Sequence, residues 1–122
     1  MKKNILIVDD FANTLFVNGF ALQQAGYNVL KAASAKEALV YFNEGTSIDL
    51  VITDYNMPEM DGLEFVRTFK KMPAYVNTPV FVLSSEAREE LKREAVSVGV
   101  SLWLRKPFMD EKLVEYIKRA ID

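Results

Sequence analysis

Residues 50–56 read Leu-Val-Ile-Thr-Asp-Tyr-Asn, a β-branched apolar run that ends at the carboxylate of Asp54. A short continuous run of this kind is typical of a strand that is buried on both faces of a parallel sheet. Strands with this strong pattern are expected at Leu50–Thr53, Ile5–Val8 and Val80–Leu83. Weaker versions of the pattern predict two further strands, nearer the edges of the sheet, at Asn28–Lys31 and Leu102–Leu104.

Helical patterns fill the segments between these strands. Apolar residues recur at a helical spacing, as at Phe16 and Phe20. Three of the patterns end at a glycine, the residue that most easily takes the left-handed conformation after a helix, namely Gly26, Gly45 and Gly99. Side chains that could cap the start of a helix are Ser34, Asp61, Ser85 and Asp110. Strands and helices therefore alternate along the chain.

This alternation predicts an α/β fold with parallel strands, because a helix between consecutive strands returns the chain to the same end of the sheet in a right-handed crossover. We expect a three-layer sandwich built around a five-stranded parallel sheet. No linker, repeat or low-complexity stretch interrupts the pattern. We therefore expect a single domain over residues 1–122, with no attached output domain.

The composition narrows the classes of function. The 122 residues include no cysteine and no histidine, which leaves carboxylates, lysine, hydroxyls and the backbone for any chemistry. The net charge of −2 gives no basic footprint for nucleic acid. No run approaches the ~18 apolar residues of a membrane span. We expect no nucleic-acid binding, no membrane insertion and a cytoplasmic location.

Charged residues stand where three of the strands end, namely Asp9 and Asp10, Asp54, and Lys106. Ligands of an open parallel sheet bind outside the carboxyl ends of its strands, so these side chains are expected to meet in one pocket. Crowded carboxylates repel one another unless a cation lies among them, which favours a divalent metal. The ammonium beside them predicts that an anion such as phosphate also binds. Taken singly, each residue also has a plain structural interpretation, as a solvated strand end, a helix-start acid or a surface lysine.

Four motifs follow the strand ends in order. They are Val8-Asp9-Asp10-Phe11, the segment 54–62 that begins Asp54-Tyr55-Asn56, Leu83-Ser84-Ser85-Glu86, and Lys106-Pro107-Phe108. With these motifs the chain resembles, over its whole length, the receiver domain of bacterial two-component response regulators, and more narrowly the stand-alone CheY-like members. The resemblance implies a flavodoxin-like sheet of strand order 2-1-3-4-5, and we expect a monomer.

The resemblance implies that Asp54 accepts a phosphoryl group from a phosphohistidine on a sensor histidine kinase or a histidine phosphotransfer protein. A carboxylate is a competent nucleophile for this transfer, which depends mainly on positioning and charge neutralisation. Lys106 and Ser84 would contact the phosphoryl oxygens. Mg²⁺, for which Mn²⁺ can substitute, would be held by Asp9, Asp10, Asp54 and the backbone carbonyl of Asn56. Such a protein is a signalling protein and not an enzyme, since it catalyses only its own aspartyl phosphorylation and dephosphorylation.

Further roles are implied by the same resemblance. Asn56 and Glu86 occupy the positions that tune dephosphorylation, and Tyr55 would control access to the acceptor. Ser84 and Trp103 would form the switch pair. Trp103 is a departure, because the family usually has tyrosine, phenylalanine or histidine at this position, and an indole N–H can only donate a hydrogen bond.

Partner surfaces are implied as well. An output protein is expected on the face of the fourth helix, the fifth strand and the fifth helix, with candidate contacts at Arg88, Arg93, Lys112 and Tyr116. The phosphodonor is expected near Phe11 and the loop at Pro107 and Phe108, where the Lys106–Pro107 peptide is expected to be cis.

Two other classes of function share parts of this pattern. A haloacid-dehalogenase-type enzyme also uses an aspartyl nucleophile and Mg²⁺, and the spacing of Asp54 and Asn56 is similar to its motif. That motif lies on the first strand of its domain, however, whereas Asp54 follows the third predicted strand. The other class is a degenerate receiver that serves only as a binding module. The intact acidic pocket argues against it, because such a module has no need of one.

Overall fold

The computed structural model describes residues 2–86, 88–106 and 110–122, except for the side chains of residues 110 and 111. Its sheet has five parallel strands in the order β2-β1-β3-β4-β5. The strands are β1 (Asn4–Val8), β2 (Asn28–Ala32), β3 (Leu50–Asp54), β4 (Val80–Ser84) and β5 (Leu102–Arg105). The predicted fold class and strand order are therefore confirmed, and the two weaker strand patterns belong to the edge strands β2 and β5.

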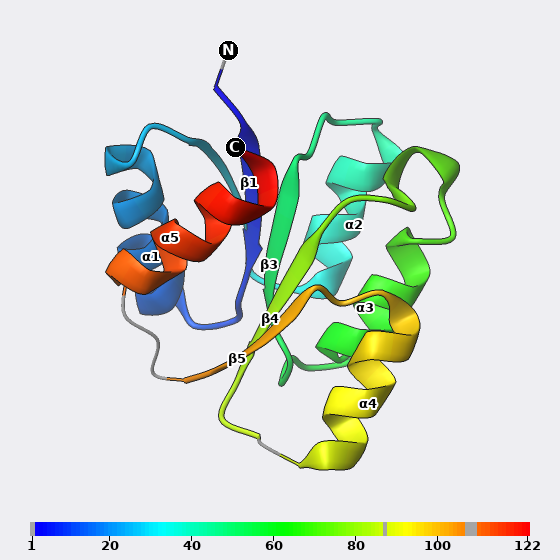
Figure 1. Cartoon of the computed structure of the whole chain (residues 1–122). Helices are drawn as coiled ribbons and strands as arrows, with labels where there is room; N and C mark the ends of the chain where they lie inside the picture. The colour runs from blue at the N-terminus through cyan, green and yellow to red at the C-terminus, as the bar shows by residue number, and fades with distance from the viewer. Residues whose placement is uncertain (1, 87, 107–109) are drawn as a thin grey trace.

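Helices cover both faces of the sheet and complete the three layers (Figure 1). They are α1 (Ala12–Gln24), α2 (Ala35–Asn43), α3 (Gly62–Phe69), the short 3₁₀ helix η1 (Pro73–Tyr75), α4 (Glu89–Val98) and α5 (Asp110–Ile121). Helices α1 and α5 lie on one face of the sheet, and α2, α3 and α4 lie on the other (Figure 1). The flavodoxin-like arrangement follows from this topology.

A separate apolar core fills the space between the sheet and each helix layer. On the side of α2, α3 and α4, the ring of Phe42 stacks on Phe69 with the centroids 4.5 Å apart, and it meets the edge of Tyr75 at 4.7 Å. Every residue of β3 and β4 is buried, which is the burial expected of central strands covered on both faces. The sheet therefore gives its carboxyl edge a rigid support.

The predicted caps had mixed outcomes. Ser34 and Asp61 each accept a hydrogen bond from the backbone N–H three residues later, as the capping-box pattern predicts. The cap predicted at Ser85 is wrong, because α4 begins only at Glu89 and Arg88 precedes it without a side-chain cap. The cap predicted at Asp110 concerns a side chain outside those that the structure describes.

Two of the strands that carry site residues reach further than the sequence predicts. Asp54 belongs to β3 and Ser84 belongs to β4, so both residues lie inside the hydrogen-bonded sheet and not in the loops after it. The backbone N–H of Lys106 donates to the carbonyl of Ser84 at 2.9 Å, which continues the pairing one residue beyond β5. The backbone positions of these three side chains are therefore fixed by the sheet itself.

Candidate functional site

The buried carboxylate of Asp54 lies at the carboxyl end of the central strand β3, and its residue is 7% exposed. The ammonium Nζ of Lys106 lies 3.2 Å from Asp54 Oδ2 and 3.3 Å from Asp9 Oδ2. One lysine therefore bridges two acidic side chains from adjacent strand ends. Pairing of this kind is required for carboxylates that are removed from water.

Burial and neighbouring charges both shift the pKa values of Asp54 and Lys106. Burial raises the pKa of Asp54, the Asp9 carboxylate raises it further, and Lys106 and a backbone hydrogen bond from Asn56 lower it. For Lys106, burial lowers the pKa, but Asp54 and Asp9 outweigh it and raise the pKa above its ordinary value. Lys106 therefore stays charged, and further positive charge at the site would favour the ionised form of Asp54.

Asp10 completes an acidic cluster with Asp9 and Asp54. One carboxylate oxygen from each of these residues can be chosen so that the three oxygens lie within 4.8 Å of one another. Asp9 is buried and accepts a hydrogen bond from the backbone N–H of Phe11 at 2.9 Å, whereas Asp10 is exposed. Oxygen ligands of this kind suit a hard divalent cation such as Mg²⁺, so the residues present fit the metal that the sequence predicts.

Ser84 is completely buried, and its hydroxyl is held at the edge of the site. Its Oγ accepts a hydrogen bond from the backbone N–H of Glu86 at 2.9 Å. Because the hydroxyl acts as the acceptor in that bond, its own proton remains able to donate to an anion. Ser84 thus has the chemistry needed to contact a phosphoryl oxygen.

Trp103 is half-buried on β5 and contacts the loop that follows β4. Its indole Nε1 donates to the backbone carbonyl of Glu86 at 3.0 Å, and its ring lies 5.5 Å from the ring of Tyr55 at an angle of 47°. Burial, followed by the charge of Asp61, raises the pKa of Tyr55, so its phenol is neutral near neutral pH. Tyr55 and Trp103 therefore form an aromatic pair directly beside the acceptor residue.

In the sequence, Gly62 stands out only as the last residue of the motif at residues 54–62. A Cβ atom built on Gly62 would lie 2.5 Å from the carbonyl oxygen of Asp54 and 3.0 Å from Cα of Tyr55. The N–H of Gly62 also donates to the carbonyl of Tyr55 at 2.8 Å. The first turn of α3 therefore packs directly on the backbone of the acceptor residue, and only glycine leaves room for this contact.

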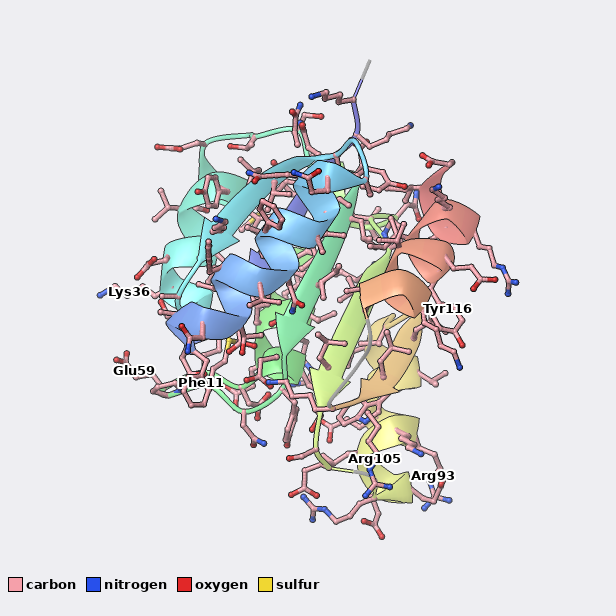
Figure 2. The ribbon with its side chains drawn as sticks, turned by 90° about the vertical axis from the view of Figure 1, so that its left-hand side faces the viewer. Phe11, Lys36, Glu59, Arg93, Arg105 and Tyr116 are labelled. Atoms are coloured by element: carbon pink, nitrogen blue, oxygen red, sulfur yellow. The ribbon has the colours of Figure 1, made fainter. Side chains whose placement is uncertain are left out.

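The predicted partner contacts fall into two groups, one near Phe11 for the phosphodonor and one on α4, β5 and α5 for the output protein. Phe11 is 69% exposed and lies, like Glu59, near the carboxyl ends of the strands (Figure 2). Arg93 and Arg105 project near this end from α4 and β5, and Tyr116 lies on α5 (Figure 2). Pro107, Phe108 and the Lys106–Pro107 peptide lie outside the residues that the structure describes.

Glu86 and the predicted contact Arg88 are engaged with each other. Arg88 Nε lies 3.2 Å from Glu86 Oε2, with the Arg88 side chain largely exposed and the Glu86 side chain partly exposed. Exposed pairs of this kind contribute little to stability. Lys112, another predicted contact, is exposed on α5.

A parallel sheet of this strand order, with an acidic cluster and a lysine at its carboxyl edge, is the architecture of a receiver domain in two-component signalling. The family model described as "Response regulator receiver domain" matches residues 5–118. The chain belongs to this family. Its fold is therefore that of a CheY-like receiver domain of two-component signalling.

Individual relatives support this assignment. The chain is 31% identical to the chemotaxis protein CheY of Pseudomonas aeruginosa over 97% of its own length and 95% of that protein. The crystallised chemotaxis protein CheY4 of Vibrio cholerae superposes with a TM-score of 0.93 at 36% identity, covering 99% of this chain and 100% of that chain.

Longer proteins contain the same unit. A gliding motility regulatory protein of Myxococcus xanthus is 36% identical over 99% of this chain, and the chain spans 15% of that protein's length. The phosphate regulon transcriptional regulatory protein PhoB of Pseudomonas aeruginosa is 31% identical over 98% of this chain, which spans 52% of that protein. In the described parts of the chain, no helix has the length and apolar character needed to cross a membrane.

Proposed function

We propose that Asp54 is the phosphoacceptor of this receiver domain and that its donor is a phosphohistidine on a sensor histidine kinase or a histidine phosphotransfer protein. The observation that carries the proposal is the placement of the buried Asp54 carboxylate 3.2 Å from Lys106 and beside Asp9 and Asp10. A buried nucleophile beside a lysine, with further carboxylates that can hold a divalent cation, suits an incoming phosphoryl group, because that group needs charge neutralisation more than acid–base help.

The transfer is a displacement at phosphorus. An oxygen of Asp54 attacks the phosphorus atom, a P–O bond forms, and the P–N bond to the donor imidazole breaks with its electron pair staying on that nitrogen. Lys106 contributes a compact positive charge, and the buried Ser84 hydroxyl donates to a phosphoryl oxygen. Mg²⁺, or Mn²⁺ in its place, would be held by Asp9, Asp10, Asp54 and the carbonyl of Asn56, and supplies charge neutralisation when bound.

The signal ends by hydrolysis of the acyl phosphate. Water attacks the phosphorus atom, the P–O bond to Asp54 breaks, and the electron pair returns to the carboxylate. Asn56 and Glu86 flank this reaction and set the lifetime of the phosphorylated form. The carboxylate of Glu86 is paired with Arg88 at 3.2 Å, so its use in the site would require that weak pair to open.

Output depends on the loop between β4 and α4. The N–H of Glu86 donates to the hydroxyl of Ser84, and the carbonyl of Glu86 accepts from the indole of Trp103. A movement of Ser84 toward the phosphoryl group therefore changes the position of the indole. The face of α4, β5 and α5 then binds an output protein with a different affinity, which shifts the population of states. Candidate contacts on this face are Arg88, Arg93, Lys112 and Tyr116.

The phosphodonor docks on the exposed side of α1. This helix contains no charged residue, and it presents Phe16 and Phe20, 58% and 55% exposed, with their rings 6.5 Å apart. Phe11, which directly precedes α1 and follows Asp10, adds a further exposed apolar side chain at the end of the helix near the acidic cluster. We propose that the domain over residues 1–122 works as a monomer in this exchange.

The proposal is tested by phosphorylation with acetyl phosphate in the presence of Mg²⁺. Intact mass should rise by one phosphoryl group in the wild type, and Asp54→Asn should abolish the gain while it keeps the fold. Stoichiometric labelling of Asp54→Asn would show that another residue is the acceptor. Phosphotransfer from candidate kinases then identifies the natural donor.

A further inference from the structure

A small cavity lies between α1 and the carboxyl ends of β1 and β3, directly behind the acidic cluster. Its volume is about 10 Å³. The acidic residues Asp9 and Asp54 line it at the strand ends, and Thr14 and Asn18 of α1 line it from the helix. The remainder of the wall is mostly apolar and comes from the strands, with Leu15 of α1 and the polar residue Thr53 among its members.

Thr14 and Asn18 are one helical turn apart and therefore lie on the same side of α1. Both are half-buried, and the side chain of neither forms a hydrogen bond with any other described residue. In the described part of the chain, no buried side-chain nitrogen or oxygen lacks a partner. Because the polar atoms of Thr14 and Asn18 have no such partner, they are not fully buried, and water must reach them.

The size and chemistry of the cavity fit one water molecule. A site must offer roughly 10–15 Å³ and about two to four polar partners to hold a water, whereas purely apolar cavities stay dry. The cavity meets the first requirement, and the residues Thr14, Asn18, Asp9 and Asp54 meet the second. Carboxylates only accept hydrogen bonds, so a water in the cavity would add a donor to those that Lys106 and the backbone N–H of Phe11 already supply.

We propose that Thr14 and Asn18 hold a bound water against the inner side of Asp9 and Asp54, and that they act through it as positioning residues for the phosphoacceptor. The second part rests on the proposed function of Asp54. Lys106 holds Asp54 through Oδ2. A water donor from the cavity beside α1 adds a second restraint on the carboxylate, and attack on phosphorus is sensitive to small errors in the orientation of the nucleophile.

The bound water is tested first, by nuclear magnetic resonance of the unphosphorylated protein. Water that stays in the cavity should give strong cross-relaxation with the side-chain amide protons of Asn18. The matched control is the side-chain amide of Asn13, which is exposed on the same helix and should show only fast-exchanging hydration. Equal, weak signals from both amides would overturn the proposal whatever the fate of Asp54.

The positioning role is tested with Thr14→Val and Asn18→Leu, which keep the approximate shape and remove the polar groups. We expect the maximal rate of phosphorylation by acetyl phosphate to fall about threefold or more in each, with little change in the concentration that gives half the maximal rate. Thr14→Ser, which restores the hydroxyl, should return most of the rate, and Asn13→Leu should match the wild type.

The outcomes separate the two proposals. Maximal rates of Thr14→Val and Asn18→Leu equal to that of Asn13→Leu, or above it, would overturn the positioning role. A loss that Thr14→Ser fails to recover would do the same, since it would indicate general damage to the packing of α1. A wild type that gains no phosphoryl mass would instead remove the proposed function of Asp54, and the cross-relaxation experiment would still decide whether the water is there.

Discussion

The indole Nε1 of Trp103 donates a hydrogen bond to the backbone carbonyl of Glu86, 3.0 Å away, while the N–H of the same Glu86 donates to the hydroxyl of Ser84. One residue of the β4–α4 loop thus connects a side chain of the acceptor pocket to an aromatic side chain on the edge strand. The two predicted switch residues have no need of direct contact, because the peptide groups of Glu86 link them.

The fluorescence of Trp103 should report activation, since it is the only tryptophan in the sequence. Beryllofluoride with Mg²⁺, which imitates a phosphoryl group on Asp54, should shift the emission to the blue and lower access to acrylamide, because the half-buried indole still has exposure to lose. Asp54→Asn should show neither change, and Mg²⁺ alone is the control. An unchanged spectrum and unchanged quenching in the wild type would mean that the indole is static.

Asp10→Ala and Asp10→Asn should weaken Mg²⁺ binding and stabilise the metal-free protein. Asp10 is the exposed member of the carboxylate cluster, so its removal relieves repulsion within 4.8 Å and creates no cavity. The gain in the free energy of unfolding should be at most about 1 kcal/mol and should shrink as salt is added. Urea unfolding without metal and a Mg²⁺ titration measure the two effects, and wild-type Mg²⁺ affinity in both variants would contradict the assignment.

Gly62→Ala should destabilise the protein by about 1–3 kcal/mol, because the new Cβ would meet backbone atoms of Asp54 and Tyr55 that cannot move freely. Gly19→Ala is the matched control in α1, where the close contact of the new Cβ would be with the flexible end of Lys31 at 2.7 Å, and Ile7 Cδ1 would lie at an ordinary 3.6 Å. Alanine is the better helix former by about 1 kcal/mol, so this control should lose little stability. Equal unfolding midpoints for the two variants would refute the role of Gly62.

Tyr27 should make the stability of the protein fall at alkaline pH. Burial, then the hydrogen bond to Asp122 at 2.8 Å and the charge of that carboxylate, raise the pKa of Tyr27 from 10.0 to about 12. The folded state therefore keeps a proton that the unfolded state releases, so the stabilisation is complete below pH 10.0 and is lost as the pH rises toward about 12.

The variant Tyr27→Phe removes this titration. It should cost about 1 kcal/mol at neutral pH, from the lost hydrogen bond, and its stability should fall less steeply than that of the wild type above pH 10.0. Urea unfolding at a series of pH values measures both quantities. Parallel pH profiles for the two proteins would show that folding does not raise the pKa of Tyr27.

Much of the architecture could be predicted from the sequence, because central parallel strands must be apolar on both faces. Leu50–Thr53 could be identified on that ground, and the parallel topology then brings Asp9, Asp10, Asp54 and Lys106 to one edge of the sheet. The ends of the strands were harder to predict. A polar residue such as Asp54 fits the last paired position of a strand as well as the first position of a loop.

The remaining features depend on contacts across the fold. Ser85 has the chemistry of a helix cap, but the loop after β4 continues to Arg88, so sequence chemistry alone places the start of α4 too early. The bond from Trp103 to Glu86 joins residues 17 positions apart and uses a backbone carbonyl, which carries no sequence signal. Thr14 and Asn18 look like ordinary polar positions of a surface helix until the cavity behind the acidic cluster is seen.

The uncharged exposed side of α1 has a consequence for how partners are selected. Long-range attraction between proteins requires charge, and it weakens with ionic strength. A helix that presents Phe16 and Phe20 and contains no charged residue of its own contributes little such attraction, although the end of Lys31 lies against it at Gly19. Contacts at the two rings should therefore depend less on salt than contacts at the acidic cluster, and one donor would be distinguished from another by how closely its side chains fit around two aromatic rings.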